Sequence, residues 1–230
     1  MRSIWRTLDR VLARDIGLVC LADCLVGVSY GAIAVSSGFP LWLPMLMSLL
    51  VFAGASQFMF VGIVAAGGNP FAAVLAGLLA NARHLPFGFA VGDAVGTRRS
   101  TRALGSHLMS DETVAFAMAQ DEAPRRRAAY WACGLGIFVF WNAGVVVGAY
   151  AGTAISDTDA FGLDAAFPAV LLALVLPSLR DKAARLPVLI GVVVALAATP
   201  FLPAGLPVLL ALAGVLAGLT AKEPELQEAR

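Results

Sequence analysis

Long apolar runs, separated by polar connections, dominate this chain of 230 residues. A helix that spans a membrane needs about 20 mainly apolar residues. Some runs are longer or shorter than one simple span, but their spacing predicts an all-α, polytopic helical membrane protein with six or seven hydrophobic segments. The apolar runs cover residues 15–36, 41–66, 70–93, 129–152, 166–179, 186–201 and 205–220.

Several of these runs contain residues that break helices. Gly54, Ala55 and Ser56 interrupt run 41–66, and run 166–179 reaches Pro177. Secondary transporters use broken helices of this kind, because irregular backbone at membrane depth is tolerated where protein or water surrounds it. In run 70–93 we expect a kink at Pro86, just beyond Arg83 and His84.

The composition supports a membrane location. Hydrophobic residues make up 60% of the chain and charged residues 13%, whereas an ordinary soluble domain has about 45–50% apolar and about 25% charged residues. The chain has too few charges to form a water-soluble surface. We predict a basic interfacial stretch over 1–14, a single transmembrane domain over 15–220 with a polar cytoplasmic loop at 94–128, and a polar tail over 221–230.

The basic residues bear on orientation, since cytoplasmic loops are enriched in Lys and Arg. Of the 16 basic residues, four precede the first run and six lie in the loop 94–128. If every run crossed once from a cytoplasmic N-terminus, that loop would lie outside. A re-entrant segment 41–66, hinged near Gly54 to Ser56, would place all basic regions in the cytoplasm with six full crossings. The alternative is a loop that is translocated despite its charge.

A weak internal repeat favours the arrangement in which every run crosses the membrane. Gly38 and Pro44, at the start of the second run, match Gly162 and Pro168, at the start of the fifth, at a constant offset of 124 residues. An inverted repeat is common in transporters and would favour segments that all span. The alternative is a chance match, because Gly and Pro are frequent here.

The loop 94–128 contains one amphipathic pattern. Residues 106–120 predict a short helix in which Ser110 is the N-cap and Asp111 and Glu112 occupy the first turn. This helix would lie on the membrane surface or pack beneath the bundle.

Polar side chains at membrane depth are costly and therefore candidate functional residues. Asn81, Arg83 and His84 are candidates for substrate binding: the guanidinium would hold a carboxylate through two hydrogen bonds, and His84 would also relay a proton. In the alternative interpretation Arg83 extends to the membrane surface or pairs with an acid such as Asp23 or Asp93.

A second candidate site lies in the interrupted run. Gly54, Ser56 and Gln57 would bind substrate if the turn opens and presents free N–H groups to an anion. The alternative is a close helix contact with a hydrogen bond from Gln57. Further candidates are polar or aromatic residues of the first and fourth runs: Asp23 for proton coupling, and Tyr30, Trp141 and Asn142 for lining the pathway, although packing in the bundle is the preferred interpretation of Trp141.

Four motifs of this chain resemble a known family. FAGASQF at residues 52–58 and NARH at residues 81–84 are similar to the N-terminal half of the AzlC (YgaZ-like) family, as are GGNP at 67–70 and DET at 111–113. The resemblance implies export of branched-chain amino acids, a small hydrophobic membrane subunit of the AzlD or YgaH type as partner, and a bacterial cytoplasmic (inner) membrane location. In the first run, Ser29 and Tyr30 replace the family's Pro-Phe, so the substrate could differ from leucine, valine and isoleucine.

Other function classes find less support. Phosphate-binding, zinc-protease and serine-hydrolase motifs are absent from the sequence, and three cysteines without paired spacing predict no metal or other cofactor. The basic clusters have no interleaved aromatic residues, which disfavours nucleic acid as a partner. Two alternatives remain: an intramembrane enzyme that uses Ser56 and His84, and a membrane assembly subunit without transport activity.

Overall fold

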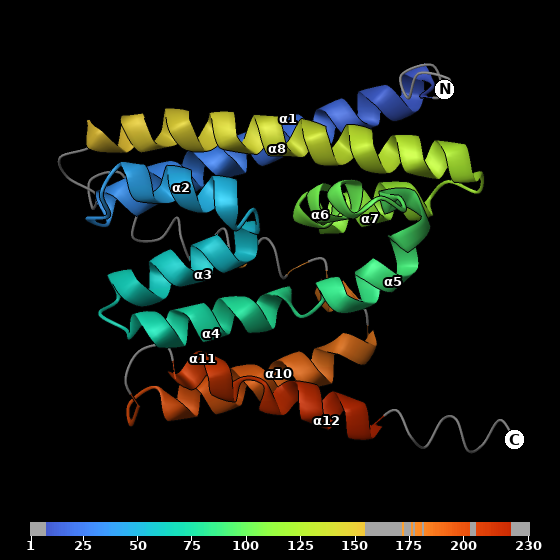
Figure 1. Ribbon diagram of the computed structural model, residues 1–230. Helices are drawn as coiled ribbons and strands as arrows, with labels where there is room; N and C mark the ends of the chain where they lie inside the picture. Colours follow the sequence, from blue (N-terminus) through green and yellow to red (C-terminus); the bar gives the residue numbers. More distant parts are fainter. Residues whose placement is uncertain are drawn as a thin grey trace, which may run out of the picture. The chain divides into compact units, whose positions relative to one another are not determined.

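The computed structural model describes residues 8–154, 172, 176, 178–180, 182–202 and 206–221. These residues form helices joined by short connections, so the predicted all-α fold is confirmed (Figure 1). The chain divides into two compact units, Met1–Gln57 with Ala80–Phe161 and Phe58–Leu79 with Gly162–Arg230. Gly162, Pro168 and Pro177 lie outside the described residues, and with them the second copy of the predicted repeat.

Among the described residues of the first unit, two helices are long and apolar enough to cross a membrane: α1 (Arg10–Ser36) and α8 (Ala123–Thr153). They pack backbone against backbone, because glycines of α8 leave no side chain between them. A Cβ at Gly144 would meet Cys24, one at Gly148 would meet Val28, and one at Gly152 would meet Ala32. The residue numbers of the contacting pairs increase together along α1 and α8, so the two helices run parallel (Figure 1).

Ion pairs join the N-terminal ends of these two helices to their surroundings. Asp9 caps α1 through the Leu12 N–H and bonds to Arg125 in the first turn of α8. The Leu12 N–H first, and then Arg125, hold the pKa of Asp9 below its ordinary value. Arg126 pairs with Asp93 at 3.2 Å. The beginnings of α1 and α8 therefore lie at the same end of the unit.

The interrupted run 41–66 forms two helices, α2 (Trp42–Leu50) and α3 (Gly54–Ala65). The predicted interruption is confirmed, but it lies at residues 51–53, and Gly54 to Ser56 form the first turn of α3. Phe52 has a φ of 35°, in the left-handed region that non-glycine residues rarely adopt. Its ring packs against Phe138 and His107, at centroid distances of 5.1 and 6.0 Å, and these contacts hold the break.

Run 70–93 also forms two helices, α4 (Pro70–Asn81) and α5 (His84–Val95), bent by 47°. Together they are long and apolar enough for one broken span or for a re-entrant loop. The kink was predicted beyond His84, but it lies just before it, at residues 82–83. Pro86 fits the first turn of α5 because the N–H groups there have no intrahelical partner.

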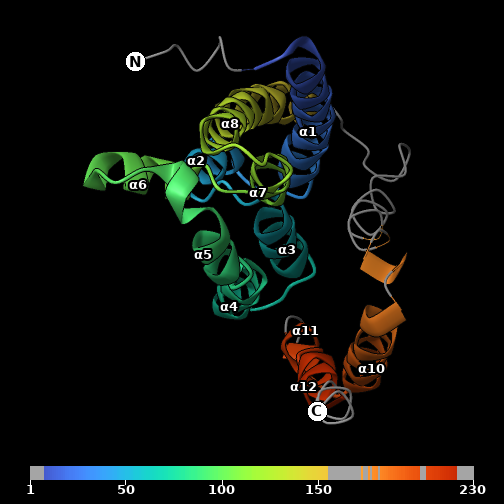
Figure 2. The same ribbon diagram turned by 90° about the vertical axis from the view of Figure 1, so that its right-hand side faces the viewer.

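The polar loop contains two helices, α6 (Arg99–His107) and α7 (Asp111–Met118). The predicted cap is confirmed, since Ser110 accepts from the Thr113 N–H and Thr113 bonds back to Ser110. Of these two helices, α7 lies against α8 and α5, whereas α6 extends away from the other helices of the unit (Figure 2). Gly105 of α6 bonds to the buried Tyr130 hydroxyl.

In the second unit, α10 (Lys182–Ala198) packs against α12 (Ala213–Ala221), with α11 (Leu206–Leu210) and the short η3 (Ser178–Arg180) beside α10. The approach is close at Gly214, where a Cβ would meet Pro187 and Gly191. Ile63, Ala73 and Ala76 form an apolar core against which Leu209 packs.

Candidate functional site

The break between α2 and α3 gathers buried polar side chains of the first unit. Gln57, in the first turns of α3, is completely buried. Its Nε2 donates to the Met47 carbonyl at 3.2 Å. A carbonyl oxygen only accepts, so this bond fixes the orientation of the amide and leaves Oε1 on the other side. Within the described part of the chain, Gln57 Oε1 is buried without a hydrogen-bond partner.

Trp141 of α8 forms one wall of this site. Its ring lies 3.0 Å from the position that a Cβ on Gly54 would occupy, so only glycine allows the ring this close to the start of α3. Tyr30 of α1 stacks on it at a centroid distance of 6.1 Å. Trp141 is 5% exposed, and its Nε1 is buried without a hydrogen-bond partner among the described residues.

Met47 connects these groups into one layer. The Tyr30 hydroxyl lies 3.8 Å from the Met47 sulfur, and the Met47 carbonyl accepts from Gln57. Successive contacts therefore lead around the break, in the order Gln57, Met47, Tyr30, Trp141 and Gly54.

Ser48 of α2 belongs to the same region, and the sequence interpretation missed it. It is 1% exposed, and its hydroxyl donates to Asn142 Oδ1 at 2.6 Å, while Asn142 Nδ2 donates to the Phe138 carbonyl. Both ends of the Asn142 amide are therefore hydrogen-bonded, and the bond from Ser48 joins α2 to α8. Ser48 is the one polar side chain in residues 41–53, and the rule that singled out Asn142 would have found it too.

The NARH segment meets the first turn of α3 through Asn81. The Ser56 hydroxyl donates to Asn81 Oδ1 at 2.8 Å, and His84 Nδ1 lies 2.9 Å from the Asn81 carbonyl oxygen. The structure thus brings together the two predicted sets of substrate-binding residues, in which Ser56 and Asn81 are 25 residues apart in the sequence. Both Ser56 and His84, the two residues of the enzyme alternative, bond to Asn81.

Arg83 has a different partner from the acids considered in the sequence. Its Nη1 lies 2.9 Å from Asp111 Oδ2 of α7, and the two side chains are 43% and 42% exposed. The alternative interpretation, pairing with an acid, is therefore confirmed, but the acid is Asp111 and neither of the two examples offered, because the break before α5 directs Arg83 toward the loop and Asp93 pairs with Arg126. Arg83 lies at an exposed edge of the unit, two residues from Asn81.

Asp23 of α1 stands apart from these contacts. Its Oδ2 is buried and has no hydrogen-bond partner within the described residues. Its role in proton coupling stays a prediction.

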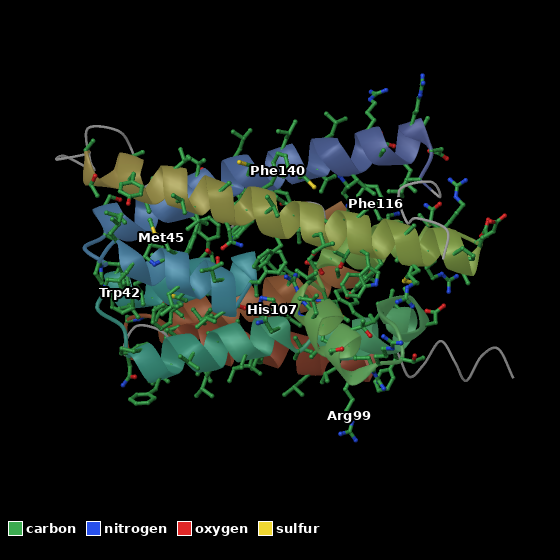
Figure 3. All side chains as sticks on the ribbon, turned by 45° about the horizontal axis from the view of Figure 1, so that its top comes forward. Trp42, Met45, Arg99, His107, Phe116 and Phe140 are labelled. Carbon is green, nitrogen blue, oxygen red and sulfur yellow. The ribbon has the colours of Figure 1, made fainter. Side chains whose placement is uncertain are left out.

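His107, at the end of α6, connects the loop to the break. Its ring packs against Phe52 and Phe138 at 6.0 and 5.7 Å, whereas Arg99, at the other end of the same helix, points away from the ribbon (Figure 3). The loop helix therefore contacts the residue whose backbone is strained. No motif in the sequence indicated this contact.

The fold and the site together define a helical integral membrane protein with buried, uncharged polar groups around a broken helix. Residues 19–155, more than half of the chain, match the family described as AzlC protein. The chain belongs to this AzlC family.

Relatives extend over much of the sequence. The inner membrane protein YgaZ of Escherichia coli is 30% identical over 161 residues, which cover 67% of this chain and 62% of YgaZ. An uncharacterized membrane protein of Archaeoglobus fulgidus is 30% identical over 169 residues, 73% of this chain and 74% of that protein. The branched-chain amino acid transport protein AzlC of Bacillus subtilis is 35% identical over 68 residues, 30% of this chain and 27% of that protein. No solved structure matches the chain.

Proposed function

We propose that this protein exports branched-chain or similar small amino acids across a bacterial cytoplasmic membrane, as one subunit of a complex with a small hydrophobic membrane protein of the AzlD or YgaH type. The observation that carries the proposal is the convergence of Ser48, Ser56, Gln57, Asn81 and Asn142 on one broken helix. Buried polar groups at a helix break are the usual substrate site of secondary transporters. Homology to a branched-chain amino acid transport protein supports the substrate class.

Arg83 has a peripheral role in this proposal. Its guanidinium is bonded to a carboxylate of the same chain, and both groups are more than two-fifths exposed. Exposed ion pairs contribute only about 0–1 kcal/mol, so an incoming carboxylate can replace Asp111 at little cost. Arg83 would then receive the substrate at the edge of the site, next to Asn81 and His84, before the substrate reaches the α2–α3 break.

The energy source is a transmembrane gradient in this account, because the sequence has no nucleotide-binding loop. Asp23 and His84 are the residues proposed to couple export to protons. A buried carboxyl group without a partner is a suitable proton carrier, since it can take up and release a proton without breaking an ion pair.

The test is efflux of labelled amino acids from preloaded vesicles that contain this chain with its small subunit. Efflux of leucine, isoleucine and valine should be faster than from preloaded vesicles without protein, and collapse of the proton gradient should slow this efflux. Efflux from vesicles that contain the chain without its small subunit should be slow, because the complex would be incomplete. Efflux equal to that of empty vesicles for every amino acid in a broad panel would refute the proposal.

A further inference from the structure

We propose that the α2–α3 break binds the substrate as a zwitterion in one fixed direction, with the α-ammonium on Gln57 Oε1 and the α-carboxylate on Trp141 Nε1 and the first N–H groups of α3. This inference rests on the proposed function and deepens it, because it names the atoms that recognise the substrate. It also adds Trp141 to the binding residues as a hydrogen-bond donor.

The site contains one unpaired acceptor and one unpaired donor. Gln57 Oε1 and Trp141 Nε1 are both buried without partners among the described residues. A buried polar group without a hydrogen bond destabilises the protein, and native structures contain few of them. Two such groups of opposite kind, on residues linked by successive contacts around the break, are complementary to a ligand that carries both a donor and an acceptor.

The protein holds both groups in place. Met47 fixes the Gln57 amide, and the Met47 carbonyl also accepts from the Val51 N–H, so Gln57 cannot rotate without losing a bond. Gly54 and Tyr30 fix the Trp141 ring between α3 and α1. Preorganised groups of this kind bind a ligand without a further ordering cost.

The two helix ends at the break have opposite polarity. The C-terminal end of a helix carries partial negative charge and the N-terminal end partial positive charge. α2 ends beside Gln57, where Met47 and Ser48 lie in its last turn, and α3 begins at Gly54 against the Trp141 ring. The first intrahelical bond of α3 is from the Gln57 N–H to Ala53, so the N–H groups of Gly54 and Ala55 have no intrahelical partner. The helix ends thus favour the same direction as the two unpaired side-chain atoms.

The required ligand is therefore small and carries adjacent ammonium and carboxylate groups. An amine alone would satisfy Gln57 and leave the Trp141 N–H unpaired, and a carboxylate alone would do the reverse. The α-amino acid satisfies both, which predicts that the free amino acid binds more tightly than either analogue.

The test measures binding of leucine, 3-methylbutylamine and isocaproate to the full chain with its small subunit in proteoliposomes. 3-Methylbutylamine lacks the carboxylate and has no other acceptor in its place, and isocaproate lacks the ammonium. Trp141→Phe keeps the ring and removes the N–H, and Gln57→Leu keeps the approximate shape and removes the acceptor. The matched control is Trp131→Phe on the same helix, because the Trp131 N–H donates to the Ala94 carbonyl at 3.2 Å outside the site.

We expect a ligand-dependent pattern. Trp141→Phe should weaken binding of leucine and isocaproate by roughly ten- to a hundredfold, as expected for a lost hydrogen bond to a charged group, and leave binding of 3-methylbutylamine unchanged. Gln57→Leu should weaken binding of leucine and 3-methylbutylamine to a similar degree and leave binding of isocaproate unchanged. Trp131→Phe should change none of the three affinities.

Thermal stability without ligand provides an independent readout. Trp141→Phe removes an unpaired buried donor, so its melting temperature should equal or exceed that of the unaltered protein. Trp131→Phe leaves the Ala94 carbonyl without its bond and should melt lower. A Trp141 with a purely structural hydrogen bond would show a lower melting temperature instead.

The results separate the two proposals. Leucine binding and efflux in the unaltered protein, with variants that shift all three ligands equally or not at all, would leave the proposed function standing and overturn the direction of binding. An unaltered protein that neither binds nor transports any amino acid would overturn both.

Discussion

At the scale of single residues, the informative groups are buried polar atoms that lack a partner. Asp23 Oδ2, Gln57 Oε1 and Trp141 Nε1 have this property within the described residues. Each unsatisfied buried group costs about 1–3 kcal/mol, which is a large fraction of a protein's stability. The sequence drew attention to all three residues because polar side chains at membrane depth are expensive. It could not show which of their atoms remain unpaired, because that depends on neighbours from other helices.

The Arg83–Asp111 pair gives a prediction at this scale. Asp111→Asn removes the competing carboxylate, so the KM for leucine efflux should fall. Arg83→Gln should raise the KM roughly tenfold through loss of a charge-assisted bond, and Arg83→Lys should assemble normally but export poorly, since lysine cannot make the two parallel bonds. The measurement is efflux kinetics in vesicles.

The double variant separates binding from structural pairing. If Arg83 receives substrate, Asp111→Asn with Arg83→Gln should behave like Arg83→Gln alone. If the Arg83–Asp111 pair only holds the loop against α5, each single variant should impair efflux to the same degree. The double variant should then impair efflux no more than either single variant.

At the scale of elements, the parallel pair α1 and α8 supports the site, because Tyr30 and Trp141 come from these two helices. Their backbones approach at Gly144, Gly148 and Gly152. Close approach through small residues is the main source of helix association in membranes, where apolar side chains gain little from leaving lipid. The position of the Trp141 ring therefore depends on the glycines of α8.

A substitution at Gly148 tests this dependence. In Gly148→Ala the new Cβ would overlap the Val28 carbonyl oxygen, a backbone atom that cannot move aside alone. Overpacking of this kind costs about 1–3 kcal/mol, so the purified complex should melt several degrees lower and lose efflux. Gly17→Ala is the control, because nothing lies within 4 Å of its Cβ, and it should melt at the original temperature or above. Equal behaviour of the two variants would contradict the packing argument.

The sequence predicted the elements better than their breaks. Apolar runs located α1, α8 and the interruption near residue 54, because these features depend on local composition, whereas the kink expected at Pro86 lies earlier, at residues 82–83. The break at Phe52 lay beyond sequence reasoning, since a left-handed phenylalanine is stabilised by Phe138 and His107 from distant elements. For the same reason the sequence offered Asp23 and Asp93 as partners of Arg83 and did not offer Asp111.

At the scale of the whole molecule, the parallel arrangement of α1 and α8 constrains the topology. If both helices cross the membrane, the chain must return to its starting side between residues 37 and 122 by an odd number of crossings. Runs 41–66 and 70–93 cannot then both cross. This reasoning favours a re-entrant segment in one of the two runs, and it places the loop 94–128 on the side of the N-terminus, as its six arginines require.

Cysteine labelling tests this topology, in a background with Cys20, Cys24 and Cys133 replaced by alanine. With run 41–66 re-entrant, Ser100→Cys in the loop should resist a membrane-impermeant thiol reagent in intact cells and react after permeabilisation. Ala66→Cys, in the connection between α3 and α4, should react in intact cells. Both side chains are exposed. The opposite labelling pattern would show that the loop is translocated.

The central claim is that an amino acid binds at the break between α2 and α3, and substrate protection tests it most directly. Ala55→Cys, in the same cysteine-free background, places a thiol in the first turn of α3, where residue 55 is partly exposed. With an efflux-competent variant, saturating leucine should slow alkylation by a small maleimide, and leucine should leave the rate at Ser100→Cys unchanged. An alkylation rate at residue 55 that is the same with and without leucine would contradict the account.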